Sequence, residues 1–171
     1  MIRTITIGLA MAAAAAVIPA AWAQGAKPPT QAFLKKTAEE QQAEISLVLL
    51  VDGRAANTRV REFAEQMIAI HKKLLKEVKE LAAEKGVNVS SEWSNEHKQK
   101  IKEFSQLSGH GFGRTYMHCI LRDHQIDVGE FEEGMQPVED SGVLHWTYRT
   151  LPMLRAHVEE AYWIQQLLQT N

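Results

Sequence analysis

Apolar residues recur at steps of four and three in three long segments, and this spacing constrains the fold more than any other feature of the sequence. Steps of this size place residues on one face of an α-helix, the face that packs into a protein interior. The three stripes are Val60, Ala64, Met67, His71, Leu74, Val78 and Leu81; Met117, Leu121, His124, Val128, Phe131 and Met135; and Leu154, His157, Ala161, Ile164 and Leu168. The spacing predicts helices over about 58–85, 112–134 and 140–169.

A fourth long helix is expected over residues 31–51, where two stripes compete for the interior. One stripe is Phe33, Thr37, Glu40, Glu44, Leu47 and Val51, and the other is Leu34, Ala38, Gln41, Ile45 and Val48. Residues 91–107 look like a shorter, more polar helix that Ser90 or Ser91 caps. Asn57 or Thr58 is expected to cap the helix over 58–85. Because no convincing alternating strand pattern is present, the sequence predicts an all-α protein.

Four long amphipathic helices bury their apolar stripes best against one another. Short connections predict two antiparallel hairpins, one on each side of a long connection that carries the short extra helix. This is the arrangement of a ferritin-like four-helix bundle with one long crossover. A simple up-and-down bundle with a helical insert is the alternative.

The first 23 residues have the three parts of a secretory signal peptide. Arg3 is the only charge before Lys27, an apolar stretch rich in alanine covers 5–17, and Ala21-Trp22-Ala23 ends it. We therefore expect residues 1–23 to be removed and the protein to be periplasmic or secreted. A retained membrane anchor is the alternative, but the apolar stretch is shorter than the ~20 residues that span a bilayer.

The remaining sequence is ordinary for a globular protein. Residues 24–30 contain Gly25, Pro28 and Pro29 and are expected to form a flexible leader, with a single domain over 31–171. Apolar residues make up 45% and the net charge is −2, so no basic surface points to nucleic-acid binding. One cysteine excludes an internal disulfide framework and a cysteine-based zinc site. No later apolar run predicts a membrane span.

Candidate chemistry centres on three of the seven histidines. His71, His124 and His157 lie on the three interior stripes, and the two in one hairpin lie at similar distances along the chain from its turn. Glu40 lies about as far from the turn near Ala55 as His71 does, with Glu44 about one helical turn closer. Three imidazoles and one or two carboxylates are therefore expected to meet near the middle of the helices.

Buried imidazole and carboxylate groups are costly unless something satisfies them. One divalent transition metal (Zn, Fe, Mn, Cu or Ni) held by His71, His124, His157 and Glu44 or Glu40 would do so. A hydrogen-bonded polar network is the other interpretation. A carboxylate-bridged dimetal centre is not supported, because such sites need glutamates three residues before their histidines. The residues at those positions here are Ile68, Leu121 and Leu154.

Several motifs resemble one known family. They are Phe33-Leu34-Lys35-Lys36 with Ala43-Glu44, Val60-x-x-Phe63-Ala64-x-x-Met67-x-x-x-His71, Asp123-His124, and Thr150-Leu151-Pro152-x-Leu154-x-x-His157. In this order they resemble the 4142 family of bacterial domains of unknown function. The resemblance implies an exported, ferritin-like helical bundle, and it implies no activity.

Three functions remain open at this point. The first is a periplasmic metal-binding bundle, and the second is a non-enzymatic envelope module for stress tolerance or partner binding, with a structural polar core. The third is an enzyme that uses a His–Glu cluster without a metal. The sequence does not identify a substrate, a partner or an oligomeric state.

Overall fold

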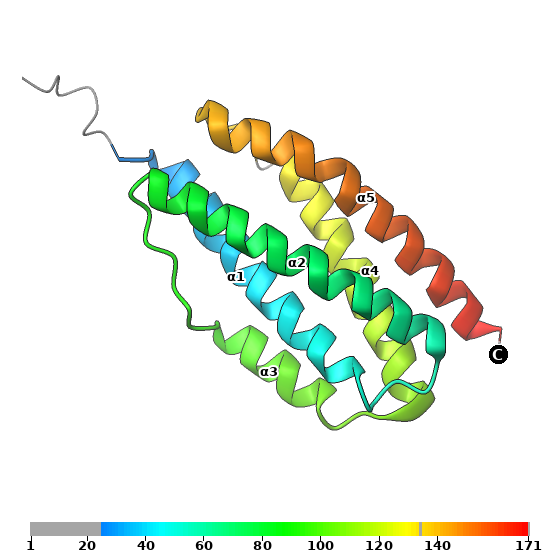
Figure 1. Cartoon of the computed structure of the whole chain (residues 1–171). Helices are drawn as coiled ribbons and strands as arrows, with labels where there is room; N and C mark the ends of the chain where they lie inside the picture. The colour runs from blue at the N-terminus through cyan, green and yellow to red at the C-terminus, as the bar shows by residue number, and fades with distance from the viewer. Residues whose placement is uncertain (1–24, 134, 171) are drawn as a thin grey trace, which may run out of the picture.

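The computed structural model describes residues 25–133 and 135–170, and within them it contains five α-helices and no β-strand (Figure 1). The prediction of an all-α protein is therefore confirmed for these residues. The signal peptide predicted for residues 1–23 lies outside them. In the described part of the chain, no helix has the length and apolar character needed to cross a membrane. The helices are α1 (Pro28–Val51), α2 (Thr58–Glu84), α3 (Asn95–Phe104), α4 (Gly109–Glu132) and α5 (Ser141–Gln169).

The long helices form two hairpins joined by one long connection (Figure 1). α1 packs along α2 and α4 packs along α5, while α2 also contacts α5. At one end of the molecule the Ala26 amide donates to the Lys85 carbonyl, and at the other end the Gly109 amide donates to the Arg54 carbonyl. The connection from α2 to α4 therefore runs from one end to the other, and it carries α3 along α1.

Three helix starts differ from the sequence prediction, and one of them is α4, which begins at Gly109 and not near residue 112. α1 begins at Pro28, inside the segment expected to be a flexible leader, because the first helical turn needs no backbone donor and tolerates proline. α3 begins at Asn95, and its cap is Ser94, whose hydroxyl accepts from the His97 amide. The cap predicted at Ser90 or Ser91 is therefore wrong.

Asn57 caps α2 and should contribute measurably to stability. Its side-chain oxygen accepts from the amides of Arg59 at 2.9 Å and Val60 at 3.4 Å. Asn57→Ala is expected to lower the free energy of unfolding by about 1 kcal/mol, because these amides at the helix start lose their acceptor. Chemical denaturation measures this loss, and Asn57→Asp, which keeps an acceptor, should stay close to wild type. Equal losses in both variants would contradict a capping role.

The interior consists of two apolar clusters with a polar layer between them. The first cluster includes Phe63, Met67, Met117, Leu121 and Ala161, and the second includes Leu34, Leu74, Phe131 and Leu154. Each helix that carries one of the three histidines passes from one cluster to the other at that histidine. The layer therefore lies at a common depth on α2, α4 and α5.

Candidate metal centre

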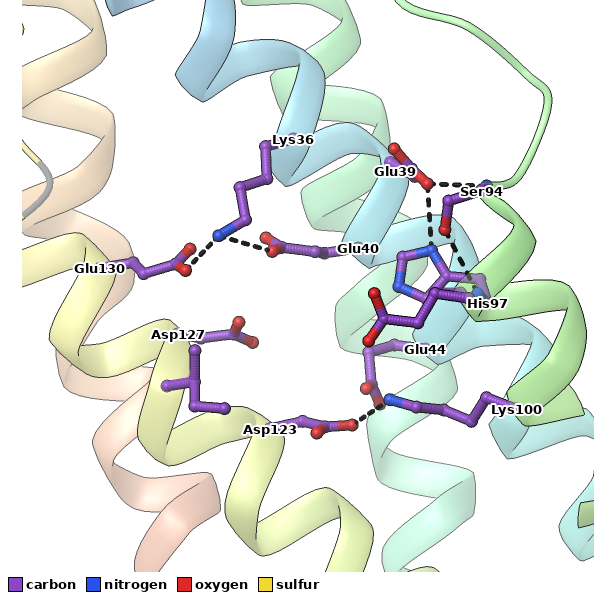
Figure 2. Close-up of a pocket in the computed structure, with 13 residues that line it drawn as sticks. Lys36, Glu39, Glu40, Glu44, Ser94, His97, Lys100, Asp123, Asp127 and Glu130 are labelled. Atoms are coloured by element: carbon purple, nitrogen blue, oxygen red, sulfur yellow. Dashed lines mark hydrogen bonds and ion pairs between the residues drawn. The ribbon is translucent and has the colours of Figure 1, made fainter.

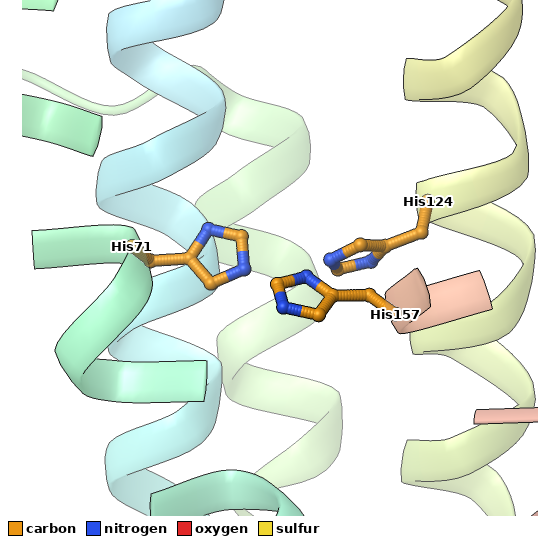
Figure 3. A group of neighbouring side chains, drawn as sticks. All are labelled: His71, His124 and His157. Atoms are coloured by element: carbon orange, nitrogen blue, oxygen red, sulfur yellow. The ribbon is translucent and has the colours of Figure 1, made fainter. Parts of the chain in front are cut away.

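The polar layer is built from one histidine on each of three helices. His71 on α2 and His124 on α4 are both 0% exposed, and His157 on α5 is 6% exposed. Helical spacing places each ring there, since Met67 and Leu74 lie on the same face of α2 as His71 and both are buried. Figure 3 shows the three rings pointing toward one another from their separate helices.

The three rings form a nearly equilateral triangle. The ring centroids of His71 and His124 lie 5.4 Å apart, as do those of His124 and His157, and those of His71 and His157 lie 5.8 Å apart. Each ring offers one nitrogen, and these three nitrogens all lie within 4.8 Å of one another. The arrangement therefore directs three donor atoms toward one small volume.

Two of the rings are held by hydrogen bonds on their outer nitrogens. The Nδ1 of His124 lies 3.1 Å from the Ile120 carbonyl oxygen, which can only accept, so Nδ1 carries the proton. The Nδ1 of His71 lies 2.7 Å from Oε1 of Gln41 on α1, and it donates to that oxygen in the same way. In both neutral rings Nε2 is then left with a free lone pair.

The inner nitrogens have no partner among the described residues. These atoms are Nε2 of His71, Nε2 of His124 and Nδ1 of His157. Burial, reinforced by the neighbouring histidines, holds the pKa of His71 well below its ordinary value. Burial also lowers the pKa of His124 and of His157 to about 4. The cluster is therefore uncharged at neutral pH, and its lone pairs are available to a Lewis acid.

The two carboxylates predicted to join the histidines lie elsewhere. Glu40 and Glu44 are one helical turn apart on α1 and line a separate cavity beside α3 and α4. The α1 residue that reaches the histidines is Gln41, on the competing stripe. The structure therefore brings together three of the five predicted ligands and leaves out Glu40 and Glu44.

A group of carboxylates in that separate cavity is absent from the sequence prediction. One oxygen from each of Glu40, Asp127 and Glu130 lies within 4.8 Å of the others. Burial and then the neighbouring carboxylates raise the pKa of Asp127 to about 9, and burial raises that of Glu40 to about 7. The spacing of four and three between Asp123, Asp127 and Glu130 places acids on one face of α4, and this pattern could have indicated the carboxylate group from the sequence.

The fold and this site define an all-α protein with a buried cluster of three histidines at the middle of its long helices. Residues 15–164 match the family described as "Domain of unknown function (DUF4142)". The chain therefore belongs to that family, as the resemblance in the sequence indicated.

Among curated proteins, no sequence matches the chain at a significant level. Among solved structures, the chain is similar to the "Crystal structure of DUF305 fragment from Deinococcus radiodurans", with a TM-score of 0.71 and 15% sequence identity. The match covers 86% of this chain and 99% of the other. At this identity the likeness supports the fold alone.

Proposed function

We propose that this protein is an exported, ferritin-like four-helix bundle that binds one divalent transition metal ion through His71, His124 and His157. The single observation that carries the proposal is the set of three buried ring nitrogens that face one another without a hydrogen bond. Buried polar atoms in folded proteins normally have partners, and a metal ion would satisfy all three at once.

The donor set favours a metal that prefers imidazole. Zinc is bound by three histidines in some catalytic sites, where the fourth position is left to water or a ligand. Zn–N bonds of about 2.0–2.1 Å in a tetrahedron place the nitrogens about 3.4 Å apart, so small side-chain rotations would close the present spacing. Metal-binding histidines commonly donate their other N–H to a carbonyl oxygen, as His124 does to Ile120 and His71 does to Gln41.

Two further features support the proposed bundle type and location. The connection between α2 and α4 spans the molecule from end to end, which is the single long crossover of ferritin-like bundles. The basic, apolar and Ala-x-Ala parts of residues 1–23 favour export to the periplasm or the medium.

Elemental analysis of protein purified without a polyhistidine tag tests metal binding. After chelation and dialysis against zinc, we expect roughly one ion per wild-type chain, as a single four-coordinate site requires. We expect no bound zinc in the triple variant His71→Gln, His124→Gln, His157→Gln. His118→Gln and His145→Gln change exposed histidines outside the cluster and are the matched controls. Equal zinc content in the triple variant and the wild type would overturn the proposal.

Gln41 provides a graded test of the same site. Gln41→Met removes the acceptor of the His71 N–H without removing a ligand, and it is expected to weaken zinc affinity by about 10–100-fold. Competition with a chromophoric chelator measures the change. Full retention of affinity would contradict an orienting role for Gln41, while the triple variant would still test the site itself.

A further inference from the structure

A second candidate site lies in the cavity between α1, α3 and α4 (Figure 2), which has a volume of about 360 Å³. Seven carboxylates line this cavity, against two lysines and one histidine. Its donors are oxygens, whereas those of the polar layer are nitrogens. The two sites therefore suit different classes of metal ion.

Three of these carboxylates already converge. Glu40 on α1 and Asp127 and Glu130 on α4 bring one oxygen each to within 4.8 Å of the others. Asp127 is only 8% exposed. Asp127 and Glu130 are three residues apart and so lie on the same face of α4, toward α1. The convergence thus joins the two hairpins across the cavity.

Glu44 gives an independent indication that a ligand is missing. It lines the same cavity one turn along α1 from Glu40, and it is only 5% exposed. Its Oε2 has no hydrogen-bond partner among the described residues. A proton on this oxygen would itself need an acceptor, so protonation does not satisfy it. A cation bound by Glu40, Asp127 and Glu130 would reach this carboxylate directly only after the Glu44 side chain turns toward them, because Glu44 is outside the group whose oxygens lie within 4.8 Å of one another.

The neighbouring lysines leave room for such a cation. Lys100 is directed to Asp123, at 2.6 Å. Lys36 is half-exposed and bridges Glu40 and Glu130, so a positive group already lies between two of the converging carboxylates (Figure 2). Its long, flexible side chain can withdraw into solvent when another cation enters.

We infer that Glu40, Asp127 and Glu130, with Glu44, bind a hard divalent cation such as Ca²⁺ or Mn²⁺ in the cavity between α1, α3 and α4. Hard cations prefer carboxylate oxygens and tolerate irregular ligand sets. This second site is independent of the tri-histidine site, and each stands if the other fails.

Calorimetric titration with Ca²⁺ and with Mn²⁺ tests the second site in the His71→Gln, His124→Gln, His157→Gln background. That background removes the nitrogen donors and keeps the two metal sites distinguishable. We expect saturable binding, weakened at least 10-fold by Asp127→Asn and by Glu44→Gln. Glu80→Gln, at an exposed carboxylate on α2, should leave the affinity unchanged. Circular dichroism confirms that each variant is folded.

Lys36→Met gives a test in the opposite direction. Removing the competing positive charge is expected to tighten Ca²⁺ binding several-fold, because like charges repel across the cavity. Absence of binding of both ions at millimolar concentration would overturn the inference. Binding that Asp127→Asn and Glu44→Gln leave unchanged would also overturn it, because the ions would then occupy exposed surface acids.

Discussion

The double variant His124→Leu, His157→Leu is expected to be more stable than the wild type when both proteins are free of metal. Two buried nitrogens without partners are removed, and leucine fills a similar volume between the two apolar clusters. An unsatisfied buried polar group costs about 1–3 kcal/mol, so the free energy of unfolding should rise by about 2 kcal/mol. His71 stays in place, which preserves its hydrogen bond to Gln41.

Urea denaturation in the presence of a chelator measures this change. His145→Leu, at an exposed position on α5, is the matched control and should differ from wild type by less than about 0.5 kcal/mol. A loss of stability in the double variant would contradict the prediction. It would mean that the rings form a satisfied network with water, the structural interpretation of this cluster.

The metal-free protein is expected to lose stability as the pH rises from about 6.5 to 8. Burial, and then Asp123, raises the pKa of Glu44 from 4.5 to about 8, and burial raises that of Asp127 from 3.8 to about 9. In this range Glu44 and Asp127 each retain, in the folded state, a proton that the unfolded state has released, and Glu40, with a pKa of about 7, retains part of a third near pH 6.5. The protons on Glu44 and Asp127 each lower the free energy of unfolding by about 1.4 kcal/mol per pH unit, so a total loss of about 4 kcal/mol is expected between about pH 6.5 and 8.

The histidines change the free energy of unfolding in the opposite direction at lower pH. Because burial lowers the pKa of His71, His124 and His157, the unfolded state binds protons below about pH 6.5 that the folded state does not. Their contribution to stability therefore falls as the pH falls from 6.5 toward 4, while that of the buried carboxyls rises. The contributions of the histidines and of the buried carboxyls to stability partly cancel between about pH 4 and 6.5. The net decline in stability is therefore confined to pH values above about 6.5.

Urea denaturation across pH 6–9 with a chelator measures this slope. Asp127→Asn removes one of the two retained protons and should reduce the slope by about half. Glu80→Gln should leave the slope unchanged, since Glu80 is exposed. A flat profile in the wild type would show that Glu44 and Asp127 are already ionised at pH 6.5.

The helices and the three histidines could be predicted because helical periodicity is a local property. The pattern around His71 places it on the same face as Met67 and Leu74, and the structure buries all three. Asp140, at the first position of the predicted 140–169 helix, caps α5. These features depend on neighbours within one helix, which the sequence contains.

The partners of the histidines depend on how separate helices pack. α1 has two stripes, and only the packing against α2 brings Gln41 to His71 and leaves Glu40 and Glu44 facing α4. The Ile120 carbonyl that orients His124 belongs to the backbone, so no residue type marks it. The cavity that gathers Asp127 and Glu130 with Glu40 exists because the two hairpins stand apart there, a distance that periodicity does not encode.

The polar layer between the two apolar clusters also fixes how far each helix can slide along its neighbours. If α5 shifted by one turn, Leu154 or Ala161 would face the other two imidazoles, and the ring of His157 would enter an apolar cluster. Such a shift would place an apolar side chain in the polar layer and an imidazole among apolar side chains, and both changes cost free energy. One longitudinal alignment of the helices is therefore strongly preferred. A metal ion bound in this layer would cross-link the two hairpins, because His71 lies on one of them and His124 and His157 lie on the other.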